Sequence, residues 1–181
     1  RWAIDLASRR DWVFEGAPEL VTASRVGASG SLPAWQLWLG AIEPKVPVAP
    51  SAAPSTPHLA ALDAHADRLA ILDVGRSSVL LVDLDRAAAA TDDVASAAIG
   101  WSTESLLGNL PVDIALGDDV AYLADAGGRR IVVADLTGRL VHGFAVHDTP
   151  MALAVAHAPG AGQDVFVLGR HGWGLRYAPD G

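Results

Sequence analysis

The chain has 181 residues, of which 51% are hydrophobic and 19% charged, and its 21 acidic and 13 basic side chains give a net charge of −8. A chain of this size can bury a sizeable core, and the lack of any apolar run of about 18 residues excludes a membrane-spanning helix. The acidic balance opposes binding to phosphate backbones, and the absence of cysteine excludes disulfides, thiolate metal sites and a cysteine nucleophile without indicating a compartment.

An internal repeat is the strongest feature of the sequence. Residues 121–136 match residues 69–84 without a gap, so that Asp73 and Asp125 take the same position. Residues 2–15 fit the same pattern, with Asp5 at that position. A weaker copy lies at residues 165–177, where the predicted turn is one residue shorter and Arg170 replaces the aspartate.

Each copy predicts a β-hairpin, because two short apolar runs flank a polar turn that contains Gly or Ser. A carboxylate at the end of the first of these strands can accept backbone N–H groups of the following turn. We therefore expect Asp5, Asp73 and Asp125 to be structural residues of their turns.

Two further strands complete the repeating unit. Proline opens a strand before three of the hairpins, at Pro57, Pro111 and Pro150, and Pro is tolerated at the first residue of a strand. Another apolar stretch follows two of the hairpins, at residues 97–101 and 140–146. Four-stranded units with a period of roughly 40 to 50 residues are typical of β-propeller blades.

The succession from Pro111 to Gly138 resembles the NHL repeat family. It contains the opening proline, an Ile-Ala pair, a Gly-Asp turn, Tyr-Leu-Ala-Asp, an Arg-Ile pair, a further Asp and a late Gly. The resemblance covers residues 57–181 and part of 1–15, although Gly128 or Ser77 stands where the family commonly has Asn. It implies an all-β fold, a β-propeller segment of four-stranded antiparallel blades that does not close a ring by itself. A WD40 propeller is disfavoured because Gly-His and Trp-Asp signatures are absent.

These units define the expected organisation of the chain. Proline at every third or fourth position in one segment favours extended chain rather than a packed strand. The predicted segments are a partial blade plus an outer strand (1–43), a Pro/Ala-rich linker or long loop (44–57), two blades (58–109 and 110–148) and a partial blade (149–181).

Side chains that could carry chemistry are few. The resemblance implies that residues just after the blade-opening prolines face a central channel, and among these only His58 and Asp113 are polar. Two groups are too few for a cation's coordination shell, and the histidines lack zinc-site spacing. No Gly-x-Ser-x-Gly elbow or phosphate-binding glycine motif is present. We therefore predict no catalytic residue, no metal and no cofactor.

Trp35 and Trp38 are the best candidates for a surface contact. They lie three residues apart in one predicted strand, so they point to opposite faces and cannot both point inward. Tryptophan is favoured at protein contacts as well as in cores.

The sequence thus favours a non-catalytic β-propeller interaction or scaffold module, part of a larger chain or assembly, whose partner is another protein or the remainder of the same chain. The alternative is part of a propeller hydrolase or lyase, of the lactonase or amidating-lyase type, with its catalytic residues mostly outside this segment. An NHL-type RNA-binding module is a second alternative, which the acidic charge disfavours. Lys45 is the only lysine beside many arginines, a bias typical of GC-rich bacterial genes.

Overall fold

A computed structural model describes residues 6–9, 12–17, 19–25, 33–39, 58–90, 93–104, 106, 110–158 and 162–181. These residues form antiparallel β-sheets and two short helices, which confirms the predicted all-β class. The chain divides into two compact units, Arg1–Ser102 and Thr103–Gly181. Among the described residues, no helix has the length and apolar character needed to cross a membrane.

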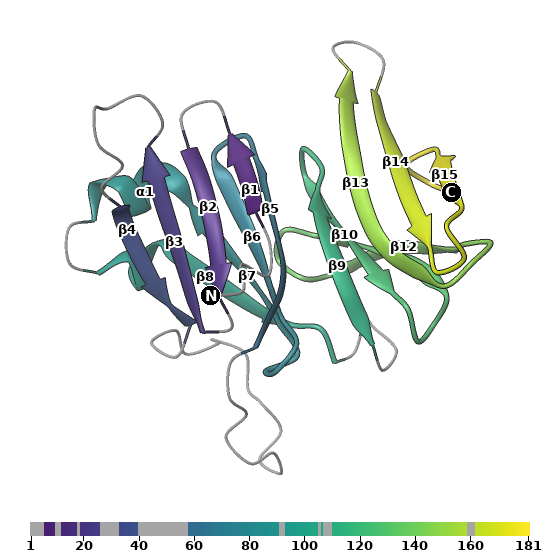
Figure 1. Ribbon diagram of the computed structural model, residues 1–181, viewed down its shortest axis with the longest axis horizontal. Coiled ribbons are helices and arrows are strands. Elements are labelled where there is room, and N and C mark those ends of the chain that lie inside the picture. The colour runs from purple at the N-terminus through teal and green to yellow at the C-terminus, as the bar shows by residue number, and fades with distance from the viewer. Residues whose placement is uncertain are drawn as a thin grey trace. The chain divides into compact units, whose positions relative to one another are not determined.

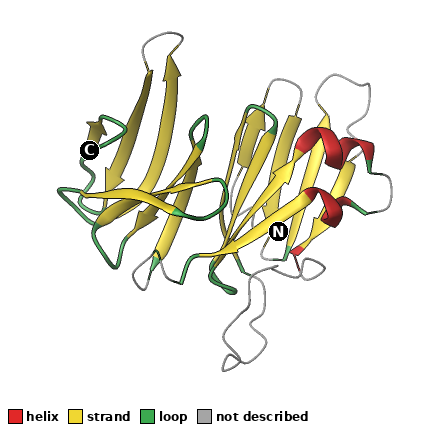
Figure 2. Cartoon of the chain, turned by 180° about the vertical axis from the view of Figure 1, so that it is seen from behind, coloured by secondary structure: helices red, strands yellow, loops and turns green. Residues whose placement is uncertain are grey.

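The first unit contains two four-stranded sheets, each with its strands side by side in chain order (Figure 1). The first sheet consists of β1 (Leu6–Arg9), β2 (Trp12–Ala17), β3 (Leu20–Arg25) and β4 (Pro33–Trp38). The second sheet consists of β5 (Leu59–His65), β6 (Arg68–Asp73), β7 (Ser78–Asp83) and β8 (Ala98–Ser102). Two short helices, α1 (Leu84–Ala89) and the 3-10 helix η2 (Val94–Ala97), connect β7 to β8 and are red in Figure 2.

The core of the first unit lies between its two sheets and under the helices. Alternate residues of β2 and β6 point into it, as the period of two in a β-strand requires, so that Phe14 and Ile71 are fully buried. Gly16 lies close to the second sheet, because a Cβ there would lie 3.0 Å from carbons of both Leu59 and Leu62. The absence of a side chain at Gly16 thus allows the two sheets to pack.

The second unit contains one sheet of four strands and one of three. The third sheet consists of β9 (Pro111–Leu116), β10 (Val120–Asp125), β11 (Arg130–Asp135) and β12 (Leu140–Ala145). The fourth sheet consists of β13 (Pro150–Ala158), β14 (Gly162–Gly169) and β15 (Gly174–Tyr177). Tyr122 and Ala124 of β10 pack against Val165 and Val167 of β14 in a shared core.

The repeat assigned to residues 2–15 is wrong in its register. It predicts a turn at residues 6–10, whereas Leu6–Arg9 form β1, and β1 pairs with β2 with Arg9 opposite Trp12. The first sheet has four strands, where the sequence predicted a partial blade plus an outer strand. The match relied on charged positions, but the alternation of buried residues along β2 and β3 decides the fold.

The register of the fourth copy also differs from the prediction. Gly169 pairs with Pro150 as Asp125 pairs with Pro111, so Gly169, and not Arg170, takes the aspartate position. The turn that follows β14 then has four residues, like the turns after β6 and β10, and is not shortened.

Candidate functional site

Asp73, at the end of β6, is fully buried and holds the turn that follows it. Its Oδ1 accepts hydrogen bonds from the backbone N–H groups of His58 (2.8 Å) and Arg76 (3.2 Å). Its Oδ2 accepts one from Nε of Arg76 (2.9 Å). The Nη2 of Arg76 in turn donates to the carbonyl oxygen of Leu39. One carboxylate thus connects the start of the second sheet, its turn and a residue that follows the first sheet.

Asp125 repeats this arrangement at the end of β10. It is also fully buried, and it accepts hydrogen bonds from the Gly128 N–H (2.9 Å) and Nε of Arg130 (3.0 Å). Nη2 of Arg130 donates to the carbonyl oxygen of Leu106 (3.0 Å). The oxygens of both carboxylates therefore accept hydrogen bonds from their own turns. Asp5 lies outside the described residues.

In the fourth sheet a different residue supplies the carboxylate. Asp148 precedes β13, and its Cβ and Oδ2 lie 2.6 Å from the position that a Cβ on Gly169 would occupy. It accepts hydrogen bonds from the N–H groups of Thr149 (2.7 Å) and His171 (2.8 Å), and its Oδ1 lies 2.9 Å from Nδ1 of His171. These bonds, the His171 N–H first among them, lower the pKa of Asp148 to about 2. The His171 side chain is 74% exposed, so a buried carboxylate orients an accessible imidazole.

His58 and Asp113, the residues expected to face a channel, have different surroundings. His58 is exposed and contributes its N–H to Asp73. Asp113 is half-buried, and its two oxygens accept hydrogen bonds from the N–H groups of Ile114 (2.9 Å) and Leu153 (2.6 Å). Asp113 therefore connects β9 to β13 within the second unit. His58 belongs to the first unit.

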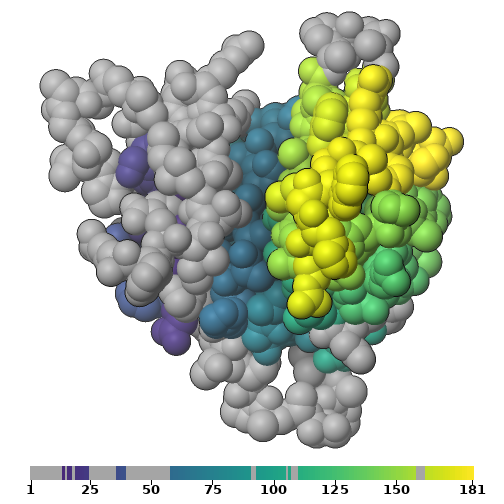
Figure 3. Space-filling view, turned by 45° about the vertical axis from the view of Figure 1, so that its right-hand side comes forward, coloured from purple at the N-terminus to yellow at the C-terminus, as the bar shows by residue number. Residues whose placement is uncertain are grey.

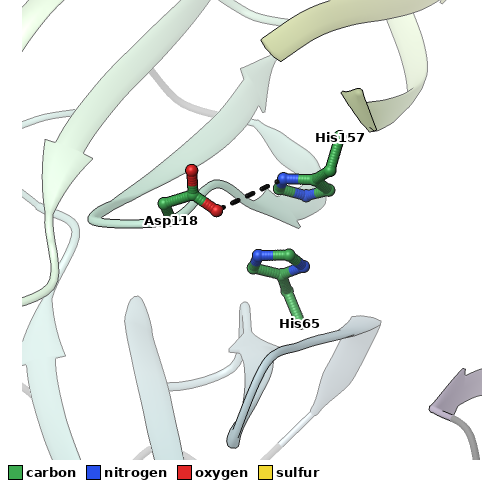
Figure 4. Close-up of side chains that lie close together, drawn as sticks. All are labelled: His65, Asp118 and His157. Carbon is green, nitrogen blue, oxygen red and sulfur yellow. Dashed lines mark ion pairs between the residues drawn. The ribbon is translucent and has the colours of Figure 1, made fainter. Parts of the chain in front are cut away.

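Asp118 and His157 form a second acid–histidine pair in the second unit (Figure 4). Nδ1 of His157 lies 3.5 Å from Oδ1 of Asp118, and its Nε2 lies 3.1 Å from the carbonyl oxygen of Leu116. The pair connects β13 to the turn after β9. His65, drawn in the same view, ends β5 and belongs to the first unit.

One face of the fourth sheet is apolar and accessible, and we call it the open face. Successive residues of a strand point to opposite sides, so Val165 and Val167 face the core while Phe166 and Leu168 face outward. Phe166 is 43% and Leu168 47% exposed. The strands that carry the open face are among the C-terminal residues coloured yellow-green to yellow at the surface in Figure 3. A groove of about 420 Å³ is lined by Phe166 and Leu168 of β14 together with Ala152 and Ala154 of β13.

The repeat makes this exposure unusual. Tyr122 and Ala124 occupy the equivalent positions in β10, and they are buried against the fourth sheet at 2% and 0% exposure. In the third sheet, this face packs against a neighbouring sheet. In the fourth sheet, no described residue of the second unit covers it. Oppositely charged Asp164 and Arg176 lie at its margin, 2.9 Å apart.

Trp38 is 56% exposed on β4, where Leu37 and Leu39 point into the core. The side chain of Trp35 lies outside the described residues. The structure therefore places one of the two tryptophans at a surface.

The chain matches no protein-family model and no curated protein sequence. Its similarity lies in three-dimensional structure. The BBS1 N-terminal region in complex with ARL6 matches with a TM-score of 0.61 at 10% identity, over 97% of this chain and 50% of that chain. Streptogramin B lyase matches with a TM-score of 0.58 at 9% identity, over 96% of this chain and 53% of that one. Hsv2 of Kluyveromyces lactis matches with a TM-score of 0.57 at 13% identity, over 91% and 45%.

These solved structures are β-propellers, and the described sheets share their strand arrangement. This chain has a β-propeller fold. It spans about half the length of the propellers that it matches. At such low identity the similarity shows the fold alone.

Sequence reasoning missed the two acid–histidine pairs of this propeller, among them Asp148–His171, and the open face. A signal for the open face was present, because Val165 to Leu168 form an uninterrupted apolar run. Such a run indicates a strand whose two faces are both buried against other parts of a protein. The Asp148–His171 pair had no comparable signal, since its members are 23 residues apart and belong to no known motif.

Proposed function

We propose that this chain is a non-catalytic β-propeller module that binds another protein through its open face. The observation that carries the proposal is the exposure of Phe166 and Leu168 at positions that the third sheet uses for sheet-to-sheet packing. Apolar patches of this kind on a folded protein mark interaction sites. Propellers with similar structures include the BBS1 N-terminal region in complex with ARL6 and a component of a mitotic checkpoint complex.

The proposal assigns Asp73 and Asp125 a structural role and treats the repeats as NHL-type. Each carboxylate is fully buried and accepts hydrogen bonds from its own turn. A metal ion or a substrate would have to compete with these donors for the oxygens. The Pro111–Gly138 pattern, with Asp125 at the end of the second strand of the sheet, supports the NHL assignment.

A site-specific photo-crosslinker tests the binding surface. A benzophenone amino acid would replace Phe166 in the full chain, expressed in its native host at its natural level. The matched control carries the same group at Leu140, an exposed residue of β12 with 53% accessibility. We expect a discrete protein adduct from position 166 and none from position 140. No adduct at position 166, or the same adducts at both positions, would refute the proposal.

The alternative, part of a propeller hydrolase or lyase, has one specific observation in its favour. The buried Asp148 orients the exposed ring of His171 through Nδ1, which directs Nε2 away from Asp148. A carboxylate that orients an imidazole is a common arrangement for a general base. Lactone hydrolysis in the presence of Mg²⁺ that disappears in His171→Gln would establish the alternative, whereas no turnover is expected if the chain is a binding module.

A further inference from the structure

We propose that the ring of His171 is a reactive nucleophile and a modification site, which accepts acyl groups from uncharged, activated acyl donors. This property goes beyond the proposed function, because it concerns the turn between β14 and β15 and a covalent change, not binding at the open face. It follows from three observations, which are the carboxylate of Asp148 at Nδ1, the exposure of the ring and the direction of Nε2.

Asp148 fixes both the orientation and the tautomer of the His171 ring. Its Oδ2 accepts the backbone N–H of His171 at 2.8 Å, and its Oδ1 lies 2.9 Å from Nδ1, so one carboxylate holds the main chain and the ring. The His171 N–H is the first of several hydrogen bonds that lower the pKa of Asp148 to about 2, so the carboxyl group is ionised at neutral pH and can only accept. Nδ1 therefore carries the hydrogen, and the lone pair is on Nε2.

Nε2 of His171 is accessible to a reagent in solution. The side chain is 74% exposed, and no described residue forms a hydrogen bond with Nε2. Asp148, by contrast, is buried, with a side chain only 8% exposed, and it also accepts the N–H of Thr149 at 2.7 Å. Gly169 leaves the space that Asp148 occupies. The structure therefore combines an accessible lone pair with a buried and firmly bound partner carboxylate.

The carboxylate also favours attack by the ring. Histidine forms covalent intermediates through a ring nitrogen when a neighbouring group activates it. Attack of Nε2 on a carbonyl carbon forms a C–N bond and places positive charge on the ring, which the anion of Asp148 stabilises. The bond between that carbon and the leaving group breaks, and the leaving group departs with the electron pair. Loss of the Nδ1 proton to solvent gives a neutral acylimidazole and balances the proton that the leaving group takes up.

The surroundings of His171 favour an uncharged donor. The net charge of −8 and the adjacent anion of Asp148 repel anionic donors such as acyl phosphates. Trp173, the last residue of the same four-residue turn, is 64% exposed and offers an apolar surface. The expected class of donor is therefore the anhydrides, activated esters and thioesters of uncharged acids.

Two other histidines separate the contributions of exposure and of the carboxylate. His157 has Asp118 at 3.5 Å from Nδ1, but its Nε2 lies 3.1 Å from the carbonyl oxygen of Leu116, and its side chain is 28% exposed. A carbonyl oxygen only accepts, so that bond requires a hydrogen on Nε2 and leaves no lone pair there. His58 is exposed, but no described carboxylate forms a hydrogen bond with its ring. Only His171 among these three combines both features.

Diethyl pyrocarbonate, an uncharged acyl donor, tests the proposal with the full chain. Peptide mass spectrometry gives the rate of carbethoxylation of each histidine in the folded protein. We expect His171 to react roughly tenfold faster than His58, and His157 to be the slowest of the three. Equal rates at His171 and His58 would overturn the proposal, because exposure alone would then explain the reaction.

The variant Asp148→Asn tests the role of the carboxylate, because it removes the charge and keeps the shape of the side chain. It should lower the rate at His171 to that of His58 and leave the rate at His58 unchanged, which also shows that the chain is folded. Asp118→Asn is the matched control and should not change the rate at His171. An undiminished rate at His171 in Asp148→Asn would contradict the proposal.

Nitrogen-15 NMR of the imidazole rings reads the tautomer directly in the wild-type chain. A merely structural role for Asp148 requires no particular tautomer, whereas the proposal requires the hydrogen on Nδ1 of His171 and the lone pair on Nε2 when the ring is uncharged. This measurement does not depend on the folding of any variant. The opposite tautomer at His171 would overturn the proposal.

Discussion

The turn after β6 and the turn after β14 both have four residues but obtain their carboxylates from different residues. In both, the first residue of the turn donates its N–H at 2.9 Å to the residue that precedes the first strand of the sheet, Val74 to His58 and Arg170 to Thr149. Asp73 supplies the carboxylate in the first case. In the second, Asp148 reaches the equivalent space from outside the hairpin, and Gly169 leaves room for it.

The difference shows that such a turn requires a hydrogen-bond acceptor at one point in space, and that this acceptor need not come from an aspartate at one fixed position in the sequence. Turn N–H groups that face the interior need a partner, since a buried donor without one costs stability. A carboxylate from the loop that precedes the first strand of the sheet meets this need as well as one from the hairpin itself.

Removal of the Asp73 carboxylate should have the largest effect. Asp73 is fully buried, and the Arg76 side chain bound to it is only 12% exposed, so Asp73→Ala leaves a largely buried cation and two N–H groups without their partner. Loss of one member of a buried pair typically costs about 3–5 kcal/mol. Urea unfolding followed by tryptophan fluorescence measures the change. Asp119→Ala, in an exposed turn, is the control, and equal stability of the two variants would contradict a structural role for Asp73.

Exchange of the carboxylate source in the fourth sheet should have a smaller and non-additive effect. Gly169→Asp places a Cβ 2.6 Å from atoms of Asp148, and overpacking of this kind costs about 1–3 kcal/mol. Asp148→Ala should also destabilise the fold, because the His171 N–H loses its acceptor. The double variant Gly169→Asp with Asp148→Ala restores the arrangement seen at Asp125 and should be more stable than the sum of the single effects. Simple additivity in urea unfolding would show that the two sources are not equivalent.

Acid should remove the contribution of Asp148 selectively. The His171 N–H and the other hydrogen bonds lower the pKa of Asp148 from 3.8 to about 2 in the folded chain. Because the folded pKa is lower than the unfolded one, the contribution is fully present above pH 3.8 and disappears as the pH falls towards 2. The stability difference between wild type and Asp148→Asn should therefore shrink over this interval. Asp135 also has a lowered pKa of about 2, but it is common to both proteins and cancels in the difference. A difference independent of pH would refute this assignment.

The sequence predicted the strands of the second and third sheets because the apolar runs, the turn residues and the aspartates of their two repeats all indicate the same strand boundaries. Apolar runs such as residues 69–72 alternate with turns that contain Gly or Ser, and Asp73 and Asp125 mark the same strand end. In the first sheet, charged residues matched the repeat by coincidence, and the buried Phe14 and Val21 set the true register.

Contacts between residues that are distant in the sequence could not be predicted. The bond from Leu153 to Asp113 and the supply of a carboxylate by Asp148 join segments 40 and 23 residues apart. No local pattern carries such information, because either partner alone has an ordinary turn or strand sequence. A pairwise contact of this kind becomes visible only when the registers of neighbouring strands are known.

The smallest effect is expected at an exposed version of the same arrangement. Asp135, at the end of β11, accepts hydrogen bonds from the Thr137 and Arg139 N–H groups and from Nε of Arg139, as Asp73 does from Arg76. The Arg139 side chain, however, is 83% exposed, whereas that of Arg76 is 12% exposed. Water can replace the lost bond at Asp135, and ion pairs at the surface contribute little to stability. Arg139→Ala should therefore leave the urea midpoint within experimental error, while Arg76→Ala should lower it clearly, since it also removes the bond to the Leu39 carbonyl. Equal effects of the two variants on the urea midpoint would mean that the burial of the arginine side chain does not determine how much these turns contribute to stability.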